Sequence, residues 1–167
     1  TFVARAIDTD KKELTDVLRA AAAHKGSAFI EIFQNCNIYN DGAFDFVREH
    51  KENRIYLEHG KPIRFGAEGE KGVVQDRDGS AAVVDVAEVG EAALMVHDAH
   101  HAEPSQAFAL SRLTAGTVGA APFGVFRDVQ REVYDDLMAE QLDVAVERRG
   151  EGDLAELLRA GDTWTID

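Results

Sequence analysis

The 167 residues can bury one substantial hydrophobic core, and 45% apolar with 29% charged residues is the composition of a soluble globular protein. A formal net charge of -13 argues against a binding surface for nucleic acid or for an anionic membrane, and no apolar run is long enough to cross a bilayer. A single cysteine excludes an internal disulfide and favours a reducing, cytoplasmic location.

The beginning of the chain has the pattern of a β-α-β unit. Residues 2–7 and 28–33 read as strands, and Asp10 with Glu13 three residues later is typical of the start of a helix that ends near Gly26. The connection is long enough for the two strands to pair in parallel. Two strands and one helix cannot cover both faces of a parallel sheet, so we expect the remaining strands to lie outside this sequence.

The next stretch passes from a strand into a polar loop. Strand 28–33 is apolar at all but one position, which is typical of a buried strand, and the loop over 34–42 is rich in asparagine. Open α/β sheets bind ligands where such strands end, and Cys36 lies in this loop. Glu31, on the strand itself, is either a structural carboxylate satisfied by the backbone or Arg5, or a residue near a cofactor.

The remainder of the chain predicts short elements. In order, they are a helix within 42–50, a hairpin of 54–58 with 62–65, a hairpin of 73–74 with 81–86, a helix from Pro104, a linker or loop over 114–122, a helix begun by Asp128, a helix over 154–158 and a strand over 163–166. The segment over 89–96 fits a strand or a helix equally well.

Several of these residues together resemble a known family. The likeness is carried by Phe29, Glu31, Cys36, Asn40 and Gly42, extends from residue 1 to about 65, and resumes over 97–113 and 124–127. In this order they resemble the segment after the last parallel strand in the β subunit of 2-oxoacid:ferredoxin oxidoreductases, closest to the 2-oxoglutarate type.

The resemblance implies an α/β fold with two parts. Residues 1–40 would be the terminal β-α-β of a parallel-sheet thiamine-diphosphate-binding domain, and residues 41–167 an α+β carboxyl-terminal extension of the β subunit. The implied activity is oxidative decarboxylation of a 2-oxoacid to its acyl-CoA, with electrons passed through a 4Fe-4S cluster to ferredoxin. The implied cofactors are thiamine diphosphate, magnesium and that cluster, and the implied partners are the α subunit, ferredoxin, the 2-oxoacid and coenzyme A.

Two residues of this chain take roles from the resemblance. Cys36 matches the cysteine that supplies one ligand to the 4Fe-4S cluster, so it would lie on the electron path and would not act as a nucleophile. Asn40 matches the family pattern and would orient the diphosphate or hydrogen-bond to cluster sulfurs. Their ordinary alternatives are a packing thiol for Cys36 and turn formation for Asn40.

The motif that binds thiamine diphosphate, a Gly-Asp-Gly followed later by Asn, is absent from this sequence. We therefore expect the thiamine and magnesium ligands outside this chain, assign no catalytic residue within it, and expect this portion alone to be inactive. The chain also begins at Thr1, without a methionine and next to an apolar stretch, which favours a fragment of a longer protein.

A rival site lies in the segment from His97 to Glu103. It offers three imidazoles and two carboxylates within seven residues, the ligand types of zinc or non-haem iron, and would suit a metal-dependent hydrolase. Its spacing is neither His-Glu-x-x-His nor a zinc-finger pattern, which favours a solvated loop. A non-catalytic acidic binding module is the remaining alternative.

Overall fold

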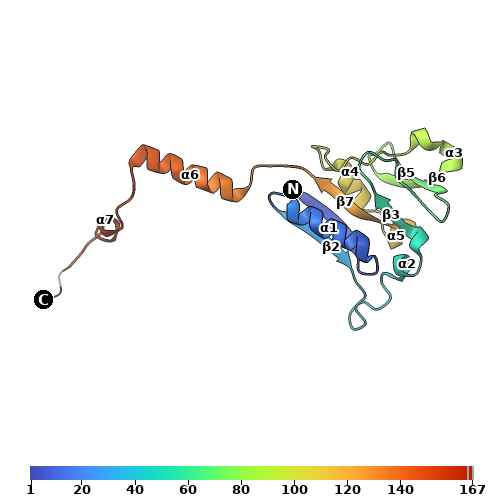
Figure 1. Ribbon diagram of the computed structural model, residues 1–167, viewed down its shortest axis with the longest axis horizontal. Helices are drawn as coiled ribbons and strands as arrows, with labels where there is room; N and C mark the ends of the chain where they lie inside the picture. Colours follow the sequence, from blue (N-terminus) through green and yellow to red (C-terminus); the bar gives the residue numbers. More distant parts are fainter. Residues whose placement is uncertain (165, 167) are drawn as a thin grey trace. The chain divides into compact units, whose positions relative to one another are not determined.

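The chain begins with the expected β-α-β unit (Figure 1). The computed structural model describes residues 1–164 and 166, and its first elements are β1 (Phe2–Ile7), α1 (Lys11–Ala23) and β2 (Ala28–Phe33). β1 and β2 pair in parallel, as predicted. Asp10 caps α1, because its Oδ1 accepts a hydrogen bond of 3.1 Å from the backbone N–H of Glu13.

The first sheet is completed by strands from much later in the chain. Its order is β2-β1-β7-β3, in which β7 (Ala121–Asp128) is antiparallel to β1 and β3 (Arg54–Leu57) is parallel to β7. The expectation that all remaining strands lie outside this sequence is therefore wrong, since β7 and β3 extend the sheet beyond β1. The linker expected over 114–122 contains α5 (Ala115–Val118) and the first residues of β7.

β2 is an edge strand of this sheet and is largely exposed, although its composition predicts a buried strand. Phe29 is 65% exposed and Ile32 is 44% exposed, whereas Phe33 is buried. The difference has a simple physical reason. No strand in the described part of the chain pairs with the outer edge of β2.

A small antiparallel sheet contains β4 (Arg64–Phe65), β5 (Lys71–Gln75) and β6 (Ala81–Asp85). The predicted hairpin between β5 and β6 is confirmed. The predicted hairpin of 54–58 with 62–65 is wrong, because β3 pairs with β7 in the first sheet and β4 pairs with β5.

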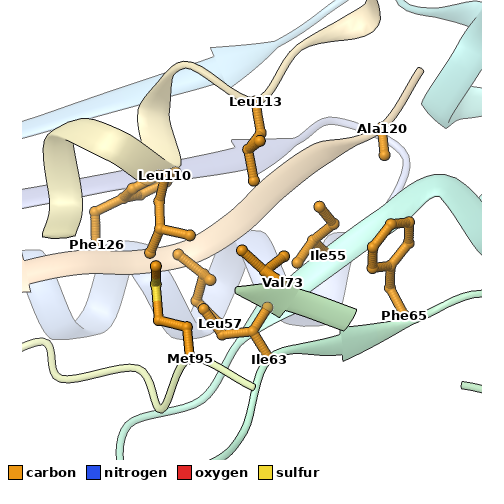
Figure 2. Close-up of a cluster of buried hydrophobic side chains, with 10 residues drawn as sticks. All are labelled: Ile55, Leu57, Ile63, Phe65, Val73, Met95, Leu110, Leu113, Ala120 and Phe126. Atoms are coloured by element: carbon orange, nitrogen blue, oxygen red, sulfur yellow. The ribbon is translucent and has the colours of Figure 1, made fainter. Parts of the chain in front are cut away.

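The largest cluster of buried apolar side chains lies between the two sheets and α4 (Ser105–Ser111) (Figure 2). In Figure 2, Leu110 of α4 points toward Met95, and Leu57 of β3 lies beside them. A second cluster, with Val17 and Ala21, places α1 against β1. The even residues of β1 thus face α1, while Val3 and Arg5 face α4.

Short helices connect these elements. They are α2 (Asp45–Arg48), a 3-10 helix over Lys51–Asn53, α3 (Val86–Val89) and a 3-10 helix over Glu91–Ala93. The segment over 89–96 is therefore helical in part, and Val96 forms an isolated bridge with Pro62. No helix in the described residues is long and apolar enough to cross a membrane.

The chain divides into two compact units, Thr1–Arg131 and Glu132–Asp167. The second unit contains α6 (Tyr134–Arg149) and α7 (Leu154–Leu158), of which α7 was predicted. The prediction that Asp128 begins a helix is wrong, because Asp128 ends β7 and α6 starts at Tyr134. The strand predicted over 163–166 includes Thr165, which lies outside the described residues, and its other members are in no strand.

Candidate functional site

The candidate site is the loop over 34–42, which leaves the carboxyl end of β2. Cys36 and Asn40 form an isolated antiparallel bridge, in which the Asn40 N–H donates to the Cys36 carbonyl oxygen at 2.9 Å. This bond closes a tight turn over Asn37, Ile38 and Tyr39. The loop therefore lies where an α/β sheet presents ligand-binding groups, as predicted.

Asn35 fixes the base of the loop. Its Nδ2 donates to Asp41 Oδ1 at 3.0 Å, and its Oδ1 accepts from the backbone N–H of Gly42 at 3.0 Å. Gly42 has a φ of +74°, a conformation that favours glycine. The Asn35 amide thus joins the two ends of the turn that carries Cys36, which is the ordinary turn chemistry of asparagine.

The Cys36 side chain is half-buried and lies among backbone donors. Hydrogen bonds from the backbone of Tyr39, Ile38 and Asn40 to the sulfur lower the pKa of the Cys36 thiol, against the opposing effects of burial and the Asp41 charge. A lowered pKa favours the thiolate, which is the form that binds metals. The turn therefore stabilises the charge state that a metal ligand requires.

Asn40 is exposed, and its side chain makes no hydrogen bond within the described residues. Its backbone, in contrast, closes the turn and contributes to the lowered pKa of Cys36. Ile38 and Tyr39, at the tip of the same turn, are also strongly exposed. A cofactor role for the Asn40 side chain stays a prediction.

One cysteine cannot hold an iron-sulfur cluster, because a four-iron cluster takes four thiolates. Within the described residues, no group of three His, Cys, Asp or Glu side chains is placed to hold a metal ion. A role for Cys36 as one cluster ligand would therefore need the other ligands from elsewhere, and it stays a prediction.

The histidines of the rival segment are held apart by hydrogen bonds to the backbone. His97 is buried, and its Nε2 donates to the Val125 carbonyl oxygen at 2.8 Å. Burial lowers the pKa of His97, so this histidine is neutral and structural. His100 Nδ1 donates to the Asp128 carbonyl oxygen at 2.7 Å, while His101 Nδ1 accepts from the Glu103 N–H at 3.2 Å. This arrangement gives no support to a metal-dependent hydrolase.

Glu31 pairs with Arg5, as the structural alternative predicts. Arg5 Nε donates to Glu31 Oε2 at 2.7 Å, and the two residues lie opposite one another in the register of β1 and β2. The pairing follows from the parallel register. The sequence could suggest it because Arg5 and Glu31 occupy matching positions in the two strands.

A second group of polar residues lies around the start of α1 and was not predicted as a site from the sequence. Tyr56 of β3 donates to Asp10 Oδ2 at 2.7 Å, and this hydrogen bond lowers the pKa of Asp10. Asp10, Tyr56 and Glu13 line one cavity of about 580 Å³ between α1, β3 and β7. Both carboxylate oxygens of Glu13 are buried without a hydrogen-bond partner in the described part of the chain, and burial raises the pKa of Glu13 to about 7.

The fold and the loop define a class: a mixed α/β protein with a cysteine-bearing loop at the end of a parallel strand. No protein-family model matches the chain. Over its whole length the chain is 44% identical to the 2-oxoglutarate oxidoreductase subunit KorB of Mycobacterium tuberculosis, of which it covers 46%.

Two archaeal relatives match a shorter part of the chain. Over 56 residues, 34% of this chain, it is 39% identical to the 2-oxoacid:ferredoxin oxidoreductase subunit beta of Saccharolobus solfataricus. Over 56 residues it is 43% identical to the 2-oxoacid:ferredoxin oxidoreductase 1, subunit beta, of Aeropyrum pernix, and it covers 17% of each archaeal chain.

The predicted resemblance to 2-oxoacid oxidoreductase β subunits is confirmed, since the relatives carry those names and one of them matches the entire chain. The chain spans about half the length of the KorB relative. These relatives are subunits of enzymes, which favours the oxidoreductase interpretation over both alternatives.

Proposed function

We propose that this chain is the carboxyl-terminal portion of the β subunit of a 2-oxoglutarate:ferredoxin oxidoreductase. The intact enzyme would convert 2-oxoglutarate, coenzyme A and oxidised ferredoxin to succinyl-CoA, carbon dioxide and reduced ferredoxin. The observation that carries the proposal is the 44% identity to a 2-oxoglutarate oxidoreductase subunit over the whole chain. It would form a complex with the α subunit of the same enzyme, and this complex would be cytoplasmic.

The loop over 34–42 is the part of this chain that would act in the reaction. Thiamine diphosphate with magnesium would supply the decarboxylation chemistry, and a 4Fe-4S cluster would accept electrons one at a time. The turn holds the Cys36 sulfur among backbone N–H groups that stabilise its thiolate, which suits one cluster ligand. Hydrogen bonds to a ligating sulfur also tune the potential of a cluster.

In this proposal residues 1–40 end a thiamine-diphosphate-binding domain, and residues 41–167 form the extension. The apolar composition of β2 together with its exposed outer edge supports a continuation of the sheet by the rest of the subunit. The thiamine and magnesium ligands would belong to that remainder. Asn40 would lie beside the cofactor, opposite Cys36 in the bridge that closes the turn.

The test is the iron and acid-labile sulfide content of the full-length complex, purified without oxygen, with its visible absorbance. Cys36→Ala should abolish or strongly reduce the cluster while thiamine diphosphate stays bound, because the substitution removes one of four thiolate ligands. Asn37→Ala is the matched control, since Asn37 is an exposed residue of the same turn. It should retain the full iron content.

An unchanged cluster in Cys36→Ala would make Cys36 a packing thiol and remove its role on the electron path. Complexes without iron or thiamine diphosphate in the wild type would contradict the proposed enzyme class itself. The two outcomes are separable, because the second is read from the wild-type protein alone.

A further inference from the structure

A groove of about 270 Å³ lies on the face of the sheet opposite α1, beside α4. Phe29 of β2 and Phe108 of α4 are among its lining residues, and they are 65% and 63% exposed. Aromatic side chains of this size are seldom left exposed in pairs on a finished surface, and such patches mark contact sites. The groove is therefore a candidate for occupation by another segment.

Arg5 lines the same groove and points to the kind of occupant. Its residue exposure is only 8%, and its guanidinium lies 5.0 Å from the centre of the Phe33 ring and 5.2 Å from that of Phe126. Nε donates to Glu31, and Nη2 lies 3.5 Å from the Ser111 carbonyl oxygen. Nη1 is buried and has no hydrogen-bond partner in the described residues.

A buried guanidinium nitrogen without an acceptor is costly, so the Arg5 Nη1 group calls for an oxygen from outside the described chain. The positive charge of Arg5 is already balanced by Glu31 at 2.7 Å. An uncharged acceptor, such as a backbone carbonyl or a side-chain amide, therefore suits the position better than a second carboxylate.

Topology gives the identity of the occupant. α1 moves the chain outward from β1 to β2 and covers one face of the sheet. Suppose that another parallel strand lies along the outer edge of β2 and comes before β1 in the chain. The connection from that strand to β1 would cross the sheet in the direction opposite to the connection made by α1. Because parallel crossovers are right-handed, a crossover in the opposite direction lies on the opposite face, over β2 and the groove.

We propose that this groove seats the helix of that crossover, from the part of the subunit that precedes this chain. The inference rests on the proposed function, in which the chain is the carboxyl-terminal portion of a longer subunit. The helix would insert apolar side chains between Phe29 and Phe108 and would offer an uncharged oxygen to Arg5 Nη1. It would complete the cover that a parallel sheet needs on both faces.

The experiment places a photo-crosslinking residue, p-benzoylphenylalanine, at Phe108 of the full-length subunit within its assembled complex, and maps the crosslinked peptide by mass spectrometry. The expected product joins residue 108 to one segment of the same subunit, amino-terminal to Thr1 and between two strand-forming stretches. Val96, which is 49% exposed and outside the groove, is the control position and should not crosslink to that segment.

Crosslinks to the other subunit, to a second copy of this subunit or to no protein would each overturn the proposal. A second variant tests the role of Arg5. Arg5→Met should lower the yield of the Phe108 crosslink several-fold, and Glu31→Gln, which leaves the guanidinium in place, should lower it less. An equal loss of crosslink yield in the two variants would contradict the proposed hydrogen-bond acceptor for Nη1. Neither readout depends on iron, so failure here is distinct from failure of the proposed function.

Discussion

Glu13 is a residue whose environment makes the stability of the protein depend on pH. Its carboxylate oxygens are buried without a hydrogen-bond partner in the described residues, and burial followed by the Asp10 charge raises the pKa of Glu13 from 4.5 to about 7. The folded protein therefore holds a proton at Glu13 that the unfolded chain releases between those values. The stability associated with that proton is fully present below about pH 4.5 and is lost as the pH rises through 7.

We predict that Glu13→Gln makes the full-length subunit more stable at pH 8 and flattens its stability between pH 5 and pH 8. The amide keeps the shape of the protonated acid and cannot ionise, so the penalty disappears. After allowance for solvent near the cavity, the gain at pH 8 is about 1–2 kcal/mol. Chemical unfolding at the two pH values measures it.

Glu88→Gln serves as the control for that measurement, because Glu88 is an exposed carboxylate of α3 and is not among the groups that shift the pKa of Glu13. It should keep the pH dependence of the wild type. A Glu13→Gln variant that loses stability equally at both pH values would mean that the carboxylate has a favourable partner.

Some of the side-chain contacts described above could be predicted from the sequence, and others could not. The Asp10 cap and the Arg5–Glu31 pair follow from short spacing and strand register, which are visible along the chain. The contact of Tyr56 with Asp10 joins residues far apart in sequence, through the pairing of β3 with β7. No local pattern contains that information.

β7 is the element that unites the sheet, since it lies between β1 and β3. Gly124, near its middle, has a φ of +108°, and a Cβ there would lie 3.0 Å from the Leu57 carbonyl oxygen. The register of β7 against β1 shifts at Phe126, two residues further along the strand. Glycine is thus required both by the backbone conformation and by the close approach of β3.

We predict that Gly124→Ala lowers the free energy of unfolding by about 1–3 kcal/mol, through strain at positive φ and displacement of β3. Gly116→Ala is the matched control, because a Cβ at Gly116 meets no atom within 4 Å and its φ is not positive. It should change stability by less than about 1 kcal/mol. Equal effects of the two substitutions in urea unfolding would contradict the close contact in β7.

The elements that sequence predicted well are those stabilised by their nearest neighbours in the chain. The hairpin of β5 and β6 has its turn at Asp76–Gly79, and the Asp76 N–H donates to the Ser80 carbonyl oxygen at 2.8 Å. β3 and β4 have the same alternating pattern but lie in different sheets, because each finds a distant partner. Alternation predicts a strand and does not predict which strand it pairs with.

At the scale of the whole molecule, the sequence of β2 carries information about its surroundings. Its run of Ala, Phe, Ile, Glu, Ile and Phe is typical of a strand with a neighbour on each side, yet β2 has β1 alone as a neighbour in the described chain. The α/β class and the β-α-β unit were predictable from this pattern. The antiparallel pairing of β7 with β1 was not predictable from it, because the two strands are about 120 residues apart in the sequence.

We predict that the 167-residue chain, expressed alone, self-associates through β2. An unpaired edge with exposed Phe29 and Ile32 offers both backbone groups and apolar area to another copy. Light scattering after size-exclusion chromatography should give a mass that rises with concentration. Ile32→Lys should return the chain toward a monomer, because a charged residue on an edge strand disfavours pairing between edges.

Val89→Lys is the control for this prediction, since Val89 is similarly exposed but belongs to α3, away from the first sheet. If Val89→Lys disrupts the association as strongly as Ile32→Lys does, exposed apolar area in general drives the contact and the edge of β2 is not specifically involved. A wild-type chain that stays monomeric at high concentration would contradict the open edge directly. Association that responds only to Ile32→Lys would show that β2 pairs with another strand when one is available.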